Sequence, residues 1–170
     1  MPSHLEFEHW VPFPIETVFS FFSNPENLPR IMPPAAGTKI VEFKSVPPPA
    51  NPSGTTMQQE TAGVGSAIVT SFKLFPPLPF RAQWIARITE FEWNHHFADV
   101  QEKGPFKSWH HRHEFVSQSR GVTAGTLIRD VIDYEVGFGA LGSAVNALFV
   151  RRQMEGTFTE RQKRLPELLD

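Results

Sequence analysis

The sequence predicts an α+β fold in which a curved, seven-stranded antiparallel sheet and two short helices wrap around one long C-terminal helix. Residues 80–136 alternate between apolar and polar side chains in four consecutive runs, joined by connections short enough for hairpins. Residues 139–169 then form a helical stretch that is much longer than the mean globular helix of about 11–12 residues. The segment before residue 80 supplies the remaining strands and the two short helices.

The amino-terminal part of the chain predicts one strand, two short helices and two further strands. Residues 4–11 alternate between apolar and charged side chains, as a half-buried strand does. Pro14 suits the first position of a helix, where its missing N–H costs nothing. Pro25 and Pro33 end the two short helices that follow. The predicted elements are a strand over 4–11, helices over 15–23 and 25–32, and strands over 38–44 and 66–75.

The carboxyl-terminal part predicts an antiparallel meander and then the long helix. The Gly104-Pro105 pair and Gly121 supply the backbone conformations that tight turns require. The four strands are predicted over residues 80–93, 97–103, 107–117 and 126–136. Apolar side chains at helical spacing predict a buried stripe at the start of the helix. This stripe consists of Leu141, Val145, Leu148 and Phe149. The charges interleaved farther along, Arg161 among them, predict a solvated face.

Composition favours one domain with an apolar core and excludes several classes of protein. The length of 170 residues predicts a single domain over 1–170, and 16 phenylalanines against one tyrosine suit an apolar interior. The absence of cysteine excludes disulfides and thiol chemistry, and a net charge of −2 offers no footprint for nucleic acid. No apolar run reaches the roughly 20 residues that span a bilayer, so we expect no stable membrane insertion. The first residues lack the pattern of a signal peptide, which predicts a cytoplasmic protein.

Two groups of segments resemble a known superfamily. The order of elements, with Val-Pro-Phe-Pro-Ile-Glu-Thr-Val-Phe at 11–19 and Pro-Glu-Asn-Leu-Pro at 25–29, resembles the START-related superfamily (SRPBCC) that includes the birch-pollen allergen fold. Residues 99–115 and 130–134 resemble its polyketide cyclase/dehydratase-like branch. The resemblance covers nearly the whole chain and implies a single START-like helix-grip domain with a cavity between sheet and helix. It implies the fold more than the chemistry, because members include enzymes, carriers and receptors.

Alternation along the strands predicts which side chains face this cavity. On residues 107–117 the more apolar face, which carries Trp109 and His113, should point inward. The hairpin to the next strand would set His113 opposite Asp130. The same register would set Trp109 opposite Tyr134.

The preceding hairpin adds a second polar pair to the cavity wall. A turn at 104–105 would bring Asp99 near His111. The predicted ligand-binding residues are Phe97, Asp99, Gln101, Trp109, His111, His113, Phe115, Ile128, Asp130, Ile132, Tyr134, Leu141, Val145 and Phe149. The predicted interior is therefore mostly aromatic, with a polar cluster at its centre.

The polar cluster is open to four interpretations. It consists of Asp99, Gln101, His111, His113, Asp130 and Tyr134. A satisfied structural network is the first, because buried polar groups must be hydrogen-bonded, and a patch that orients a ligand in an apolar pocket is the second. The third is catalysis, with candidates His111, His113, Asp130 and Asp99 as acid, base or orienting group. A metal site is least favoured, because two histidines spaced i, i+2 on a strand are common without metal, and we expect no metal and no cofactor.

These observations favour a protein that binds a small hydrophobic or amphipathic molecule, such as a lipid, quinone or polyketide-like compound. The alternative is a cofactor-free enzyme of the cyclase or dehydratase type that uses a cavity His/Asp pair. A third hypothesis is an accessory protein that binds a protein partner through the proline-rich segment 47–52. Finally, Gly137, Gly139 and Gly142 before the long helix suggest either a tight corner or a hinge that admits ligand.

Overall fold

A computed structural model describes residues 2–54, 60–73, 78–137, 139, 144 and 146–170. It contains one seven-stranded antiparallel sheet in the order β1-β7-β6-β5-β4-β3-β2. The strands are β1 (Ser3–Val11), β2 (Lys39–Lys44), β3 (Ala67–Lys73), β4 (Arg81–Glu92), β5 (His96–Lys103), β6 (Ser108–Ser117) and β7 (Thr126–Glu135). The helices are α1 (Ile15–Ser23), α2 (Leu28–Ile31) and α4 (Arg151–Leu169), with short 3-10 turns at Pro25–Asn27 and Pro34–Ala36 and a π-helical turn, η3 (Asn146–Val150), before α4. The predicted α+β helix-grip architecture is confirmed.

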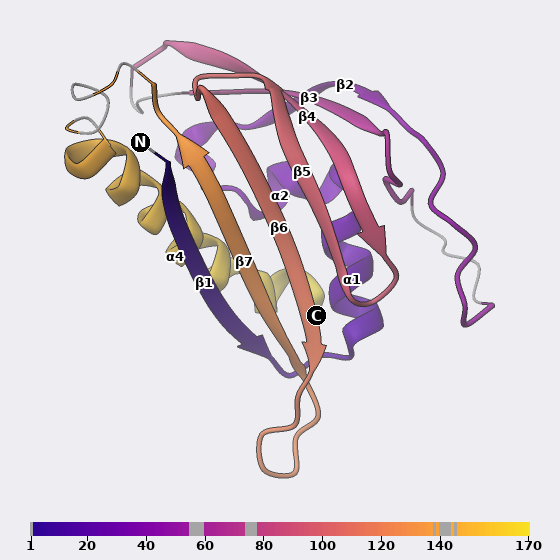
Figure 1. The fold of residues 1–170 in the computed structure, drawn as a ribbon. Helices are drawn as coiled ribbons and strands as arrows, with labels where there is room; N and C mark the ends of the chain where they lie inside the picture. The colour runs from indigo at the N-terminus through magenta and orange to yellow at the C-terminus, as the bar shows by residue number, and fades with distance from the viewer. Residues whose placement is uncertain (1, 55–59, 74–77, 138, 140–143, 145) are drawn as a thin grey trace.

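The sheet curves around the helices, which all lie on its one covered side (Figure 1). Because side chains alternate between the two faces of a strand, one set on each strand points toward the helices. On β7 this set is buried completely and consists of Thr126, Ile128, Asp130, Ile132 and Tyr134. The opposite face carries a ladder of charges, in which Arg129 pairs with Glu8 across β1 and β7. The helix side of the sheet is therefore the core of the protein.

Two separate apolar clusters form this core. The larger cluster contains Phe19 of α1, which meets Phe97 and Phe115 of the sheet edge to face at centroid distances of 6.0 and 5.2 Å. The smaller cluster contains Phe158 of α4, which stacks on Phe7 of β1 with ring centroids 4.4 Å apart. Such aromatic pairs add about 0.5–1.5 kcal/mol beyond the area that they bury. The long helix contributes to both clusters, since Leu165 near its end belongs to the larger one.

The start of the long helix differs from the prediction. Leu148 and Phe149 are 64% and 63% exposed, so the predicted buried stripe is wrong at these two positions. Leu141 and Val145 lie outside the described residues. The contact of the helix with the core comes later, where Met154, Phe158, Arg161 and Leu165 are buried. The covered face of α4 therefore begins after Leu148 and Phe149.

The segment before this helix needs glycine at two described positions. Gly137 has φ +88° and Gly139 has φ +54°, conformations that other residues rarely adopt. Both values fit a tight corner between β7 and the helix, and the hinge remains a prediction. Gly142 lies outside the described residues. No helix in the described part of the chain has the length and apolar character needed to cross a bilayer.

The proline-rich segment is tied to the body of the protein. Trp93 Nε1 donates a hydrogen bond of 2.7 Å to the carbonyl oxygen of Pro49. Gly63 lies so close to the segment that a Cβ there would stand 2.6 Å from the backbone of Pro47 and Pro48. The segment therefore covers the end of the sheet instead of extending freely from it.

Candidate functional site

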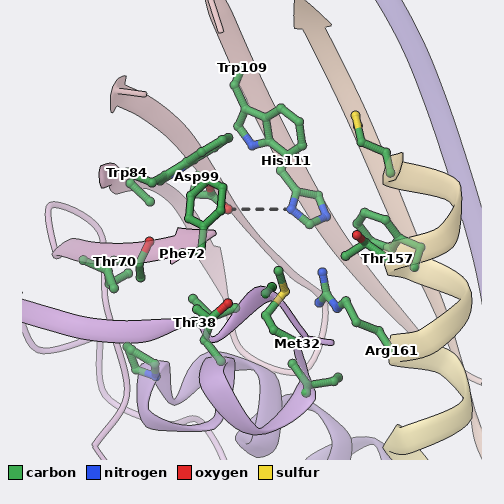
Figure 2. A pocket seen from close by; sticks show the side chains of 18 of the residues that line it. Met32, Thr38, Thr70, Phe72, Trp84, Asp99, Trp109, His111, Thr157 and Arg161 are labelled. Carbon is green, nitrogen blue, oxygen red and sulfur yellow. Dashed lines mark ion pairs between the residues drawn. The ribbon is translucent and has the colours of Figure 1, made fainter. Parts of the chain in front are cut away.

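A cavity of about 720 Å³ lies between the sheet, the short helices and α4. This volume falls within the range of small-molecule sites, about 300–1,000 Å³. Its walls include residues of both apolar clusters, such as Phe21 and Ile31 of one and Met154 and Phe158 of the other. The cavity therefore lies between the two clusters, and Figure 2 shows part of its lining.

Aromatic side chains form one end of the cavity. The Trp84 and Trp109 rings meet edge to face with centroids 5.0 Å apart. Phe106 packs against both, at 5.7 Å from Trp84 and 5.1 Å from Trp109. Phe72 of β3 lies 6.3 Å from Trp84 and extends this group. Such a wall offers a large apolar contact area to a ligand, with few polar atoms.

Six of the predicted ligand-binding residues line the cavity. They are Phe97, Asp99, Trp109, His111, His113 and Phe149. Five others lie in the core behind this lining: Phe115, Ile128, Asp130, Ile132 and Tyr134. Gln101 is occupied elsewhere, since its amide bonds both backbone groups of Phe106 at 2.7 and 3.2 Å. Leu141 and Val145 fall outside the described residues. Alternation gave the inward face correctly, but an inward residue reaches the cavity only where no neighbour covers it.

The predicted strand pairs occur in the structure. His113 lies opposite Asp130, and Trp109 lies opposite Tyr134, across β6 and β7. Asp99 lies opposite His111 across β5 and β6. The His113–Asp130 and Asp99–His111 pairings bring polar side chains of three adjacent strands together, with Asp99 and both histidines on the cavity wall and Asp130 behind them.

Asp130 holds both histidines from behind. His111 Nε2 lies 3.0 Å from Asp130 Oδ1 in a buried hydrogen bond. His113 Nδ1 lies 2.6 Å from the same oxygen, although this contact is not aligned as a hydrogen bond. On the other side, His111 Nδ1 lies 3.9 Å from Asp99 Oδ2, a contact marked by the dashed line in Figure 2. His111 thus stands between two carboxyl groups, one behind it and one at the cavity surface.

Burial controls the protonation of this cluster. Burial and the neighbouring His113 lower the pKa of His111 from 6.5 to about 4, against the opposing effect of Asp130. Burial also lowers the pKa of His113, and it raises the pKa of Asp99. Burial alone would raise the pKa of Asp130, but contacts with His113 and His111 hold it well below its usual range. At neutral pH both imidazoles are therefore neutral, and the ionised Asp130 accepts a hydrogen bond from the Nε2–H group of His111.

Arg161 is the functional residue that sequence reasoning missed. It was predicted to lie on the solvated face of the helix, yet it is only 8% exposed and lines the cavity. Its guanidinium group lies over the ring of Phe158, 4.7 Å from the centroid, and 5.9 Å from the centroid of Phe22. The sequence contains a pattern that could have revealed this. The spacing of positions 154, 158, 161 and 165 places Arg161 on the same face of an α-helix as three buried apolar residues.

Three side chains of the cluster offer possible metal ligands. One atom each of Asp99, His111 and His113 lie within 4.8 Å of one another. Two features of the site disfavour a cation. Burial favours the neutral form of Asp99, and the charge of Arg161 acts on both Asp99 and Asp130. These residues therefore suit the recognition of a polar group better than the binding of a metal ion.

Comparisons with known proteins agree with this architecture. Residues 11–163 match the family model described as polyketide cyclase/dehydrase and lipid transport. No curated protein sequence matches the chain. Among solved structures, a START superfamily protein from Mycobacterium smegmatis is similar, with a TM-score of 0.62, 16% identity and coverage of 98% of this chain and 96% of that one.

Two further solved structures share the fold. Protein CV1439 from Chromobacterium violaceum has a TM-score of 0.66 and 13% identity, with 98% of this chain and 96% of that chain covered. Norcoclaurine synthase from Thalictrum flavum has a TM-score of 0.63 and 13% identity, with 99% of this chain and 87% of that chain covered. At these identities the likeness establishes the fold alone. The family match extends over nearly the whole sequence, and the chain belongs to the polyketide cyclase/dehydrase and lipid transport family.

Proposed function

We propose that this protein binds one small hydrophobic or amphipathic molecule, of the lipid, quinone or polyketide-like type, in the cavity between the sheet and α4. The observation that carries the proposal is the 720 Å³ cavity itself, which is lined mainly by apolar side chains and has a few convergent polar groups. Sites for small molecules have this composition, because apolar contacts supply most of the binding free energy and polar groups fix the orientation. The family description, which includes lipid transport, supports the same function.

Two adjoining parts of the cavity wall suit different parts of an amphipathic molecule. Trp84 and Trp109 provide an apolar wall at one end. Asp99 and His111 provide hydrogen-bonding groups on the adjoining surface. Phe149 lines the cavity while remaining 63% exposed, so we expect the entry for a ligand beside it. A ligand would enter there and place its apolar body against the tryptophans.

A blocked cavity tests the proposal. Ala86 of β4 lines the cavity, and an Ala86→Phe substitution would place a ring inside it. The probe is the neutral fluorophore 6-propionyl-2-(dimethylamino)naphthalene, displaced by 1-decanol. The wild-type protein should bind one equivalent of the fluorophore, and Ala86→Phe should weaken binding at least tenfold.

The matched control adds the same ring outside the cavity. Val116 on β6 is 55% exposed, so Val116→Phe should leave binding unchanged. Both variants must first show a cooperative unfolding transition. Equal binding by wild type and Ala86→Phe, or no stoichiometric binding by the wild type, would overturn the proposal.

The second candidate function is a cofactor-free enzyme of the cyclase or dehydratase type. It is favoured by one observation: His111 lines the cavity and is hydrogen-bonded from behind by Asp130, the arrangement of an oriented general base. Norcoclaurine synthase, which shares the fold, has been seen in complex with dopamine and hydroxybenzaldehyde. Against it, a pKa of about 4 makes His111 a weak base at neutral pH, and Tyr134, whose hydroxyl could donate a hydrogen bond to a developing oxyanion, lies behind the cavity lining.

Exchange of acidic C–H protons tests this second candidate. Nonane-4,6-dione carries methylene protons that a positioned base removes, and their exchange with deuterium is followed by NMR. An enzyme of this type should accelerate the exchange, and His111→Gln should abolish the acceleration. Exchange at the rate of buffer alone with the wild-type protein would argue for binding without catalysis of this kind.

A further inference from the structure

Arg161 carries a buried positive charge that the protein does not neutralise by direct contact. Among the described residues, no carboxylate lies within 4.0 Å of its guanidinium group, and this group donates no hydrogen bond. Burial lowers the pKa of Arg161, while Asp130 and Asp99 act at longer range in the opposite direction. A buried charge without a partner is costly, so such charges are ordinarily paired.

The neighbouring arginine on the same helix shows what a structural role looks like. Arg164 donates two hydrogen bonds to the carbonyl oxygen of Arg30, at 2.7 and 3.2 Å, and so ties α4 to α2. Arg161 makes no such bond to any described residue, although it lies only three positions earlier and is more deeply buried. Its charge therefore serves something other than the attachment of the helix.

The surroundings of Arg161 direct its polar edge into the cavity. Aromatic contacts with Phe158 and Phe22 hold the guanidinium group at 4.7 and 5.9 Å from their ring centroids. Arg161 itself lines the cavity, as does His111. Figure 2 shows the two side chains approaching the same space from α4 and from β6. The N–H groups of Arg161 are thus presented to whatever occupies this part of the cavity.

The nearby acidic groups do not remove the need for an anion. Asp130 is engaged by His111 and His113, and burial favours the neutral form of Asp99. The ionised Asp130 nevertheless opposes the entry of more than one negative charge. The site therefore suits a single negative charge in a planar group, which a carboxylate supplies and which an arginine binds through two parallel hydrogen bonds.

We propose that the ligand of the cavity carries a carboxylate that pairs with Arg161, while its apolar body lies against Trp84 and Trp109. The protein is then a carrier or sensor of an amphipathic monocarboxylic acid. This inference rests on the proposed function, since it concerns the occupant of the same cavity. Thr38 also belongs to the lining of this cavity, and its buried hydroxyl has no hydrogen-bond partner among the described residues.

The test compares an acid with its uncharged ester. Decanoic acid and methyl decanoate share one apolar chain, and at pH 7.5 the acid is ionised. Both displace the neutral naphthalene fluorophore from the wild-type protein if the cavity binds apolar chains. The inference predicts that the acid binds at least tenfold more tightly than the ester. The variant Arg161→Met, which keeps the length of the stem, should bind the two equally and bind the ester as wild type does.

A control variant and the acid-to-ester ratio of the wild type separate the possible failures. Arg152→Met removes an exposed charge from the same helix and should retain the preference for the acid. Equal affinity of the wild type for acid and ester would overturn the carboxylate inference and leave the proposed function standing. Displacement by neither compound, and no binding of the fluorophore, would overturn the proposed function. Because the acid-to-ester ratio is measured on the wild type, the inference is tested even if Arg161→Met fails to fold.

Discussion

Protonation of the buried His111 should destabilise the fold between pH 7 and pH 5. In the folded protein its pKa is about 4, against 6.5 in the unfolded chain. The unfolded state therefore binds a proton that the folded state rejects, and the free energy of unfolding falls as the pH drops through 6.5. The loss is complete below the folded pKa. A free energy of unfolding that falls with the pH is the behaviour of a buried neutral histidine. A salt-bridged histidine would give the opposite change.

The size of this effect follows from the two pKa values. A shift of one pKa unit corresponds to about 1.4 kcal/mol, and linkage over the interval from pH 7 to pH 5 gives a loss of about 2 kcal/mol from His111. Burial lowers the pKa of His113 as well, which adds to the loss. Asp99 acts in the opposite direction, because burial raises its pKa and the folded state then gains stability as the pH falls. A domain with a total stability of about 5–15 kcal/mol would show such a change clearly.

Urea unfolding at pH 7, 6 and 5 measures the effect, with tryptophan fluorescence as the signal. The variant His111→Gln retains an N–H donor for Asp130 but cannot be protonated in this range. Between pH 7 and pH 5 it should lose about 2 kcal/mol less stability than the wild type. The control His95→Gln removes a histidine from an exposed turn and should follow the wild-type curve. Parallel curves for the wild type and His111→Gln would refute the account of this cluster.

Four further substitutions, one of them a control, test the packing. In urea titrations, Phe158→Ala should lower the free energy of unfolding by about 3–5 kcal/mol, because the ring is buried and stacks on Phe7. The control Phe80→Ala removes a ring that is 63% exposed and should change the free energy of unfolding by less than about 0.5 kcal/mol. Gly156→Ala should raise the free energy of unfolding by about 0.5–1 kcal/mol, and with it the urea midpoint. The reason is that α4 is helical there and, outside the backbone of its own helix, nothing lies within 4 Å of the added Cβ. Gly63→Ala should lower stability by about 1–3 kcal/mol in the same assay, since its Cβ would stand 2.6 Å from the proline-rich segment; an unchanged midpoint would contradict this close approach.

The sheet and its polar pairs could be predicted from sequence because both follow from local rules. Strand side chains alternate with a period of two, and short hairpins fix the register of the next strand. This was sufficient to place His113 opposite Asp130 and Asp99 opposite His111. The same rules gave an inward face for β7, all of which is buried.

The helical side of the site could not be predicted in the same way. Which face of α4 is covered depends on how the helix docks on the sheet, and the docking begins near Met154 instead of at Leu148 and Phe149. Arg161 was therefore assigned to solvent, because a charged side chain is rarely fully buried without a partner. The contribution of α1 and α2 to the cavity, through side chains such as Phe22, also arises only from tertiary packing.

The central claim is that the space between the sheet and α4 holds a small amphipathic molecule. A crystal structure of the protein with 10-bromodecanoic acid tests it directly, since the anomalous signal of bromine marks the end of the chain. The account predicts continuous ligand density inside the cavity, with the bromine near Trp84 and Trp109 and the carboxylate within hydrogen-bond distance of Arg161. Bromine peaks confined to the outer surface, with the cavity occupied only by ordered water at saturating acid, would contradict it.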